Sequence, residues 1–390
     1  MKTFDWIVIG AGITGAALAY ELVRQGFSVL VLEQHATLAG ATRFGYGGIA
    51  CWAGTTDLTR QLCRESRARY PTLSAELETD IQYRELDLLL TLPPDAVPEQ
   101  VAATYTTCEV PPQLLTVAAA CDREPLLNPA AIGGALLAHH GHIHSLAAVQ
   151  GYCQQLTHRG GTYQIETVLD LVRQGDRILG VRTATATYGA ENVVVCAGGI
   201  SRALLKQAGI PVRIYFTHAE VIETPPVNLR LQTMLMPAQT DRYRLEGAAT
   251  RPELDTLWDQ PGQEPVPPIL DVGIIQFLDG SLRIGQISRV LTDPYAQPNP
   301  VQSEAEMRLG IGTLLPALQD LPGTWHHCLV AFSHDRLPLI GPLPGLDGIH
   351  LFSGFSNPLA IVPPLAQRFA QWANDRSDPL IPQLSPARLL

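Results

Sequence analysis

The sequence predicts an α/β protein with two domains, one built on a parallel sheet around a glycine-rich turn and one built on an antiparallel sheet. The first observation is a set of three glycines, Gly10, Gly12 and Gly15, that lies between two apolar segments. The second is a change of pattern from Pro211 to about Leu321, where strands of moderate polarity are separated by prolines. The third is the length of 390 residues, which exceeds what one ordinary hydrophobic core accommodates.

The N-terminal segment has the order strand, glycine turn, helix, strand and acid. Residues 6–9 predict a buried parallel strand, residues 16–25 predict a helix closed by Gly26, and residues 29–32 predict a second strand that ends on Glu33. In this order a Gly-x-Gly-x-x-Gly pattern indicates a dinucleotide site, although glycines alone are also typical of a buried turn without a ligand. We therefore predict a dinucleotide-binding βαβ unit.

Each residue of this pattern has a physical reason. Gly10 makes the tight turn, Gly12 lets the backbone approach a pyrophosphate, and Gly15 lets the helix pack closely on the strand. The helix N-terminus offers unpaired N–H groups and a partial positive charge to the phosphates. The carboxylate of Glu33 can accept both ribose hydroxyls of an adenosine, and it disfavours NADP because the extra phosphate would meet a like charge.

A segment at residues 40–49 follows Glu33 and contains four glycines, one at its first position and three between residues 45 and 48. Composition alone is compatible with a flexible surface loop. Its place directly after the predicted ribose-binding acid favours a loop that passes close to a bound cofactor. Thr42 and Arg43 could reach the pyrophosphate from there.

The remaining elements follow from periodicity and turn residues. Asp279-Gly280, between two alternating apolar runs, is the strongest hairpin signal in the chain. We expect helices at residues 57–82, 145–159, 304–315 and about 363–374, and strands at residues 86–92, 192–196, 212–223, 243–246, 272–278, 282–287 and 349–352.

Composition excludes several classes of function. The net charge of −10, without a basic run, disfavours nucleic acid as a partner, and no apolar stretch is long enough to span a membrane. Seven cysteines without a Cys-x-x-Cys pair indicate a reducing compartment, and we expect a cytoplasmic protein. Histidines at alternating positions in residues 139–144 invite a metal interpretation. Because no carboxylate or cysteine set with ligand spacing accompanies them, we expect a hairpin strand and no metal.

The fingerprint, Glu33 and the stretch Gly40-Ala41-Thr42-x-x-x-x-Gly47-Gly48-Ile49 resemble the D-amino-acid oxidase superfamily of FAD-dependent oxidoreductases. This superfamily includes glycine oxidase, sarcosine oxidase and D-amino-acid dehydrogenases. The stretches Asp335-x-x-Pro338-x-Ile340-Gly341 and Gly354-Phe355-Ser356 resemble it as well. The resemblance implies an FAD-binding Rossmann-like domain of the glutathione-reductase type, formed by residues 1–85, 145–210 and 326–390, and an α+β substrate domain with an antiparallel sheet, formed by residues 86–144 and 211–325.

The resemblance also implies which residues hold the cofactor. The C-terminal helix should point the positive end of its dipole at the flavin pyrimidine. The implied FAD-binding residues are Gly10, Gly12, Ile13, Thr14, Gly15, Glu33, Gln34, Ala41, Thr42, Arg43, Tyr46, Gly47, Gly48, Ile49, Val168, Ala197, Gly198, Cys328, Gly341, Gly354, Phe355, Ser356, Asn357, Pro358 and Leu359. We expect Tyr46, His218 and Tyr243 to lie in the catalytic pocket.

The sequence departs from the family where a cation anchors the substrate carboxylate. The position of the Arg of glycine-oxidase-like members is Val330, and the position of the Lys of sarcosine oxidases is Ile361. The family's Gly-His-Gly after the serine is replaced by residues 357–359. The chain therefore either anchors the substrate carboxylate with a different residue or acts on a substrate without that carboxylate. The candidate anchors are Arg43, Arg242, Arg244 and His218.

Cys328 stands seven residues before Asp335, the spacing at which some sarcosine oxidases bind FAD covalently. The alternatives are a thioether to the flavin and a small apolar filler on a strand.

These features together imply an FAD-dependent amine or amino-acid oxidase or dehydrogenase that removes a hydride equivalent from a carbon bearing nitrogen. The electron acceptor is then O2 or another carrier. The first alternative is oxidation of a 2-hydroxy acid or another CH–OH substrate, which needs a base such as His218 or His334. The second is a flavin-binding protein without catalysis.

Overall fold

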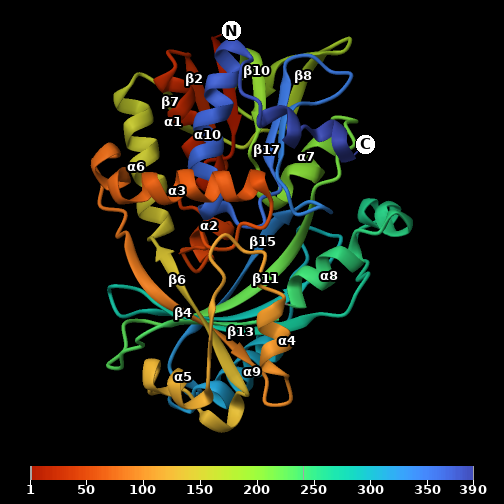
Figure 1. Ribbon diagram of the computed structural model, residues 1–390. Helices are drawn as coiled ribbons and strands as arrows, with labels where there is room; N and C mark the ends of the chain where they lie inside the picture. The colour runs from red at the N-terminus through yellow and green to blue at the C-terminus, as the bar shows by residue number, and fades with distance from the viewer. Residues whose placement is uncertain (1, 240, 390) are drawn as a thin grey trace.

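A computed structural model describes residues 2–239 and 241–389 and contains two sheets that lie one above the other in Figure 1. The first sheet has eight strands in the order β16-β17-β10-β1-β2-β7, with β9 paired to β10 and β8 to β9. Five neighbouring strands, from β17 to β7 in this order, run parallel. The bounds are β1 (Thr3–Ile9), β2 (Val29–Glu33), β7 (Thr162–Ile165), β8 (Asp170–Gln174), β9 (Arg177–Arg182), β10 (Thr187–Val195), β16 (Leu339–Pro342) and β17 (Ile349–Ser353).

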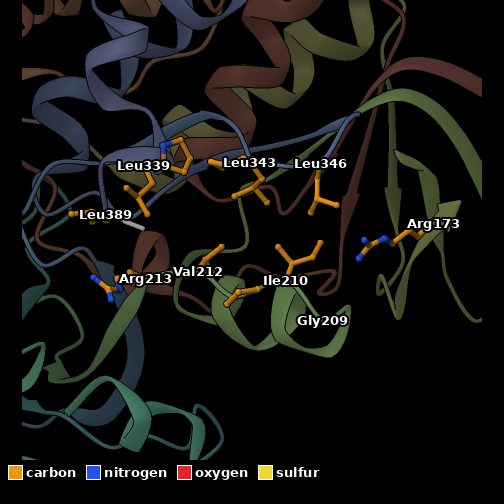
Figure 2. A pocket seen from close by; sticks show the side chains of 12 residues that line it. Arg173, Gly209, Ile210, Val212, Arg213, Leu339, Leu343, Leu346 and Leu389 are labelled. Atoms are coloured by element: carbon orange, nitrogen blue, oxygen red, sulfur yellow. The ribbon is translucent and has the colours of Figure 1, made fainter. Parts of the chain in front are cut away.

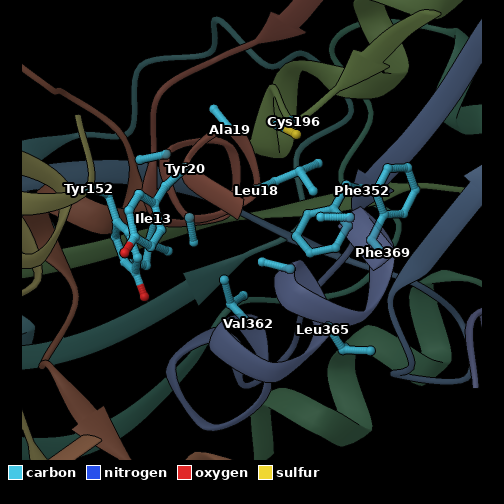
Figure 3. Packing of buried hydrophobic residues seen from close by; sticks show 14 of the residues in the cluster. Ile13, Leu18, Ala19, Tyr20, Tyr152, Cys196, Phe352, Val362, Leu365 and Phe369 are labelled. Atoms are coloured by element: carbon cyan, nitrogen blue, oxygen red, sulfur yellow. The ribbon is translucent and has the colours of Figure 1, made fainter. Parts of the chain in front are cut away.

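Helices cover one face of this sheet, and a hydrophobic core lies between these helices and the sheet. Helix α1 (Ile13–Arg24) packs between α10 (Pro358–Asp375) and α6 (Ser145–His158), and α3 (Asp57–Glu76) lies across α10. Figure 3 shows the two sides of this core, with Tyr20 beside Tyr152 and Phe352 beside Phe369. The glycine turn at residues 10–12 therefore emerges from a rigid, fully packed support.

The second sheet has nine strands in the order β15-β11-β14-β13-β12-β4-β6-β3, with β5 paired to β6. Its pairings are antiparallel except between β12 and β4. The bounds are β3 (Gly48–Ile49), β4 (Arg84–Leu92), β5 (Gln113–Leu115), β6 (Gly134–His142), β11 (Tyr215–Glu223), β12 (Met234–Pro237), β13 (Ile269–Gln276), β14 (Leu282–Arg289) and β15 (Thr324–Phe332). The predicted fold class is confirmed.

Short helices surround the second sheet. They are α2 (Ala41–Phe44), α4 (Pro98–Ala103), α5 (Val117–Arg123), α8 (Asp241–Ala249) and α9 (Pro300–Leu314), while α7 (Ser201–Gln207) belongs to the first sheet's side. The helix α9 packs on β13 and β14 and buries Met307 and Ile311. The predicted domain division places residues 326–332 with the cofactor domain, whereas the structure pairs them with β11 in the second sheet.

The prediction of a strand at residues 243–246 is wrong, because these residues lie in helix α8. The carboxylate of Asp271 accepts the backbone N–H groups of Asp241 and Arg242 at 3.1 and 3.2 Å, which satisfies donors of the first helical turn. Leu245 and Ala249 are buried at helical spacing. The tertiary partner Asp271 is remote in sequence, so local alternation misleads here.

The C-terminal helix begins at Pro358, five residues before the predicted start. Pro358 suits the first helical turn because its missing N–H has no partner there in any helix. Pro363 lies inside the helix and cannot donate to the carbonyl of Leu359. The hydroxyl of Tyr70 donates to that carbonyl instead, at 2.6 Å, so the helix continues through the proline. Among the helices of the described chain, none is long and apolar enough to cross a membrane.

Candidate functional site

One large cavity, with a volume of about 1030 Å³, lies between the two sheets and takes its walls from both. It is somewhat larger than most single-ligand pockets, which suits a dinucleotide together with a second molecule. The predicted residues that line it are Gly10, Gly12, Ile13, Thr14, Glu33, Gln34, Ala41, Thr42, Tyr46, Gly47, Gly48, Val168, Ala197, Gly198, Tyr243, Cys328, Gly354, Phe355, Ser356, Asn357, Pro358 and Leu359.

The glycine turn forms one end of the cavity, and two of its glycines cannot carry a side chain. Gly10 has φ +97°, and a Cβ there would lie 2.8 Å from the carbonyl oxygen of Cys196. A Cβ on Gly15 would overlap the carbonyl oxygen of Gly10. The first turn of α1 therefore sits directly against β1 and β10, with its N–H groups at the cavity wall.

Glu33 is buried at the end of β2 and is held by two backbone donors. Its Oε2 accepts the N–H of Ala11 at 2.8 Å, and its Oε1 accepts the N–H of His35 at 3.0 Å. Each carboxylate oxygen has a second lone pair, so the group can still accept the two hydroxyls of a ribose. The geometry fits the adenosine half of a dinucleotide.

The loop after β2 brings Thr42 and Arg43 to different places. The hydroxyl of Thr42 accepts the N–H of Ile13 at 3.0 Å, which links the loop to the start of α1 at the cavity. Arg43 forms a bidentate pair with Glu223 at 3.0 and 2.8 Å and does not line the cavity. Burial raises the pKa of Glu223, but Arg43 and Arg283 outweigh it and hold that pKa low. Arg43 therefore joins the loop to the second sheet.

Four other expected residues do not line the cavity, namely Gly15, Ile49, Gly341 and His218. Along β11 the side chains alternate between the two faces of the sheet. Thr217 faces α8, where its hydroxyl donates to Glu246 at 3.2 Å. His218 therefore lies on the other face, where its Nε2 is 3.0 Å from the carbonyl oxygen of Asp293. His334 is engaged as well, since its Nδ1 is 2.9 Å from the hydroxyl of Thr250.

The N-terminus of α10 and the strand β15 complete the wall on the side of the first sheet. Residues 353–359 line the cavity where α10 begins, so the positive end of this helix faces the site. Cys328 lies on β15 opposite Ala219 of β11. Burial raises the pKa of the Cys328 thiol to about 12, and Arg283 and Arg242 nearby only reduce this effect.

The opposite end of the cavity has apolar walls that the sequence motifs do not indicate. Leu88 and Leu90 come from β4, Met234 and Met236 come from β12, and Trp52 and Tyr105 come from two loops. The apolar run in residues 86–92 predicts a strand but not which of its faces meets a ligand. Arg242 of α8 also lines this end.

The histidines of residues 139–144 diverge. The Nδ1 of His139 is 3.0 Å from Asp87 on the exposed side of β6, whereas His140 is buried and its Nδ1 accepts the indole N–H of Trp52 at 3.1 Å. Within residues 2–239 and 241–389, no three His, Cys, Asp or Glu side chains are grouped as metal ligands.

A smaller cavity of about 230 Å³ lies against the other face of the first sheet. Figure 2 shows Leu339, Leu343 and Leu346 on one side of it, Ile210 and Val212 on the other, and Arg173 and Arg213 at its two ends. It contains no residue of the predicted site.

The fold and the large cavity define a dinucleotide-binding oxidoreductase. Within the cavity, the end that fits the nucleotide is continuous with the end that can hold a second molecule. The family model described as FAD dependent oxidoreductase (DAO) matches residues 5–372, and the chain belongs to this family. The glycine turn, the free lone pairs of Glu33 and the helix N-termini at the cavity fit FAD.

Individual relatives are more distant. The chain is 27% identical over 243 residues to a glycine oxidase of Geobacillus kaustophilus, across 59% of this chain and 64% of that protein. It is 30% identical over 228 residues to a monomeric sarcosine oxidase of Streptomyces avermitilis, across 54% of this chain and 56% of that protein. The matched stretches thus span less than two thirds of these curated relatives.

Solved structures match over nearly the full length. The glycine oxidase of Geobacillus kaustophilus superposes with a TM-score of 0.78 at 20% identity, covering 100% of this chain and 99% of that chain. An L-proline dehydrogenase from P. horikoshii superposes with a TM-score of 0.80 at 18% identity, covering 100% and 98%. At these identities the likeness concerns the fold.

Proposed function

We propose that the chain is an FAD-dependent oxidoreductase that oxidises a C–N bond of an amine or amino acid. The observation that carries the proposal is the large cavity, which joins the glycine turn and the start of α10 to an apolar chamber large enough for a second molecule. The chamber is lined by Trp52, Leu88, Leu90, Tyr105, Met234 and Met236. The names of the relatives support the donor class, since glycine oxidase, sarcosine oxidase and L-proline dehydrogenase all act on amines. When bound, FAD supplies the chemistry of accepting a hydride equivalent from the carbon next to nitrogen, which leaves an imine that water hydrolyses.

The residues of the chain contribute orientation and environment to this chemistry. The N–H groups at the start of α1 and the Thr42 hydroxyl would hold the pyrophosphate, and Glu33 would hold the ribose. The positive end of the α10 dipole faces the cavity and would favour negative charge on the flavin. Tyr46 and Tyr243 line the chamber, and its apolar walls exclude water.

Oxidation of a CH–OH substrate is the less supported alternative. It requires a base for the hydroxyl proton, and the two histidines expected for this role, His218 and His334, are bonded to Asp293 and Thr250 outside the cavity lining.

For Cys328, the raised pKa favours a protonated thiol, so we propose that FAD is held without a covalent bond to it. Seven cysteines without a disulfide between them support a reducing compartment such as the cytoplasm.

An anaerobic reduction experiment tests the proposed function. Purified protein should show the visible spectrum of an oxidised flavin, and this spectrum should bleach when amines and amino acids are added without oxygen. Admitting O2, or adding an artificial acceptor dye, then identifies the electron acceptor. Bleaching by 2-hydroxy acids alone would support the CH–OH alternative, and retention of colour with every donor would support a flavin-binding protein without catalysis.

A further inference from the structure

We propose that Arg242 of α8 binds the carboxylate of the substrate, and that the substrate is an amino acid with a large apolar side chain. This inference rests on the proposed function and names the substrate class of the same cavity. The positions at which relatives carry an anchoring cation hold Val330 and Ile361 in this chain.

The structure separates the four candidate anchors. Arg43 is committed to Glu223 in a bidentate pair, and His218 is on the other face of β11. Arg244 is exposed, with 78% of its side chain accessible, and pairs with Asp241 at 3.1 Å. Arg242 alone of the four lines the cavity, and only 15% of its side chain is accessible.

The residues around Arg242 favour its charged form, and its Nε lacks a hydrogen-bond partner in the described chain. Burial lowers the pKa of Arg242, but Glu246, Tyr243 and Asp271 together outweigh it and raise that pKa. The Nε of Arg242 is 3.3 Å from Oε1 of Glu246, yet it has no partner with hydrogen-bond geometry among residues 2–239 and 241–389. This ion pair is made at Nε, and Tyr243 is a further hydrogen-bond partner of the guanidinium. The proposal assigns the remaining donors of Nη1 and Nη2 to a ligand carboxylate, a group that guanidinium donors bind strongly.

Asp271, Glu246 and Arg336 lie close to Arg242 or Tyr243, and none of the three lines the cavity. Asp271 uses its carboxylate oxygens to hold the N–H groups of Asp241 and Arg242. Burial raises the pKa of Asp271 and of Glu246. Arg336 adds a second cation, with its Cζ 5.1 Å from the ring centroid of Tyr243, whose other near neighbour is Cζ of Arg242 at 5.2 Å. Of these four charged side chains only that of Arg242 lines the cavity, so a ligand anion there meets its guanidinium.

The chamber next to Arg242 selects an apolar group. The indole N–H of Trp52 donates to His140, and the hydroxyl of Tyr105 donates to the carbonyl of Ala238, so both aromatic side chains present apolar surface to the cavity. Their ring centroids are 6.1 Å apart. Burial, with Cys108 and Tyr243 nearby, raises the pKa of Tyr105 to about 12.

Tyr46 places the anchor relative to the cofactor loop. Its hydroxyl is buried and has no hydrogen-bond partner in the described chain, and burial raises its pKa while Arg283 and Arg242 reduce this effect. Arg242 and Tyr46 both line the cavity, and Tyr46 belongs to the loop implied to hold the cofactor. In the proposed pose, a carboxylate at Arg242 leaves the adjacent carbon toward the cofactor end and the side chain toward Trp52 and Tyr105.

Three ligands without an amine test the proposal on the FAD-loaded protein by titration calorimetry and by the change in the flavin spectrum. They are 3-phenylpropanoate, its uncharged amide 3-phenylpropanamide, and propanoate. Wild-type protein should bind 3-phenylpropanoate about 10- to 100-fold more tightly than the amide, because of the charged hydrogen bonds, and by a similar factor more tightly than propanoate, because of the apolar burial. Equal binding of the acid and the amide would overturn the anchor, and equal binding of the two acids would overturn the apolar chamber.

Variants then assign the effect to Arg242. Arg242→Met should remove the preference for the acid over the amide, Arg242→Lys should retain part of it, and the exposed Arg244→Met should retain all of it. An equal loss in Arg242→Met and Arg244→Met would contradict the proposal, and the wild-type comparison decides it if Arg242→Met does not fold. Flavin bleaching by phenethylamine as fast as by phenylalanine would leave the proposed function standing without the anchor. Tight binding of the acid at Arg242 without bleaching by any amine would support the anchor and contradict the proposed function.

Discussion

The two ends of the large cavity are built from different parts of the chain. The nucleotide end uses backbone N–H groups and glycines within residues 10–15, together with Glu33 only one helix further on. The chamber at the other end uses side chains from segments that lie between residues 52 and 243, which only the second sheet brings together. A change at the first end therefore acts on the backbone and the cofactor, whereas a change at the second end alters the ligand or the local stability.

The largest effect is expected from a side chain in the glycine turn. In Gly15→Val the new Cβ overlaps the carbonyl oxygen of Gly10, so α1 must move away from β1 and the N–H groups leave the cavity wall. We expect loss of bound flavin and a fall in the free energy of unfolding of about 3 kcal/mol or more. The ratio of flavin to protein absorbance and urea unfolding measure the two quantities.

Gly247→Ala is the matched control on the other side of the cavity. A Cβ at Gly247 meets open space within helix α8, and alanine is favoured over glycine there by up to about 1 kcal/mol. Full flavin content in Gly15→Val, or an equal loss in both variants, would contradict the view that the turn acts through close backbone packing.

A buried ion pair below the nucleotide end gives the second effect, which is expected on stability alone, whereas Gly15→Val is expected to lose the flavin as well. Arg69 of α3 pairs with Glu21 of α1 and with Glu76, and it donates to the carbonyl of Pro363 in α10. Arg69→Met leaves Glu21, whose side chain is 1% accessible, with Arg24 as its remaining cation. Burial already raises the pKa of Glu21, so we expect a loss of about 3–5 kcal/mol in urea unfolding.

The double variant Arg69→Met with Glu21→Gln separates charge burial from lost packing. Removing the stranded carboxylate should recover part of the stability, because the cost arises from an unpaired buried charge. If the double variant were no more stable than Arg69→Met, packing of the arginine stem between the three helices would be the correct explanation.

A buried histidine of the second sheet gives a pH-dependent effect. Burial, with Arg84 beside it, lowers the pKa of His142 to about 3, against 6.5 for an unshifted histidine. Below pH 6.5 the unfolded chain takes up a proton at this residue and the folded chain does not. Stability is therefore lost as pH falls, at up to about 1.4 kcal/mol per pH unit, or about 2 kcal/mol by pH 5.

His142→Gln should make the free energy of unfolding fall less steeply between pH 7 and pH 5 than in the wild type. His139→Gln, on the exposed side of the same strand β6, is the control. Measuring the difference between variants cancels the contribution of the carboxylates. Parallel pH profiles for wild type and His142→Gln would show that the ring is accessible to protons in the folded protein.

The same contrast between the two ends explains how far the sequence predicts the structure. The turn at Gly10, the helix after it and Glu33 are predictable because each depends on neighbours within about one βαβ unit. The prediction for Arg43 also used only local sequence, since its position in the loop suggests a phosphate partner. In the structure Arg43 pairs instead with Glu223, 180 residues away in the sequence. Pairing with a remote residue leaves no trace in the local pattern.

The substrate end shows the limit most clearly. Residues 243–246 alternate as a strand does, but Asp271 supplies acceptors for the first turn of a helix, and the segment becomes α8. This change turns Arg242 toward the cavity and Arg244 toward solvent. The sequence offers both arginines as candidate anchors and contains nothing that distinguishes them without the fold.

Cys328 is where the two ends meet, and the smallest effect is expected there. It lies on a strand of the second sheet but lines the cavity beside residues implied to hold the cofactor. The nucleophilic form of a cysteine is the thiolate, and burial raises the pKa of this thiol to about 12. We therefore expect acid precipitation to release all flavin into the supernatant, and Cys328→Ser to keep its flavin with a stability loss of about 1 kcal/mol for a buried hydroxyl. Colour that stays in the washed wild-type pellet and is released in Cys328→Ser would establish the thioether instead, and would mean that the bound cofactor, through its own charge, overcomes the burial that holds the thiol protonated.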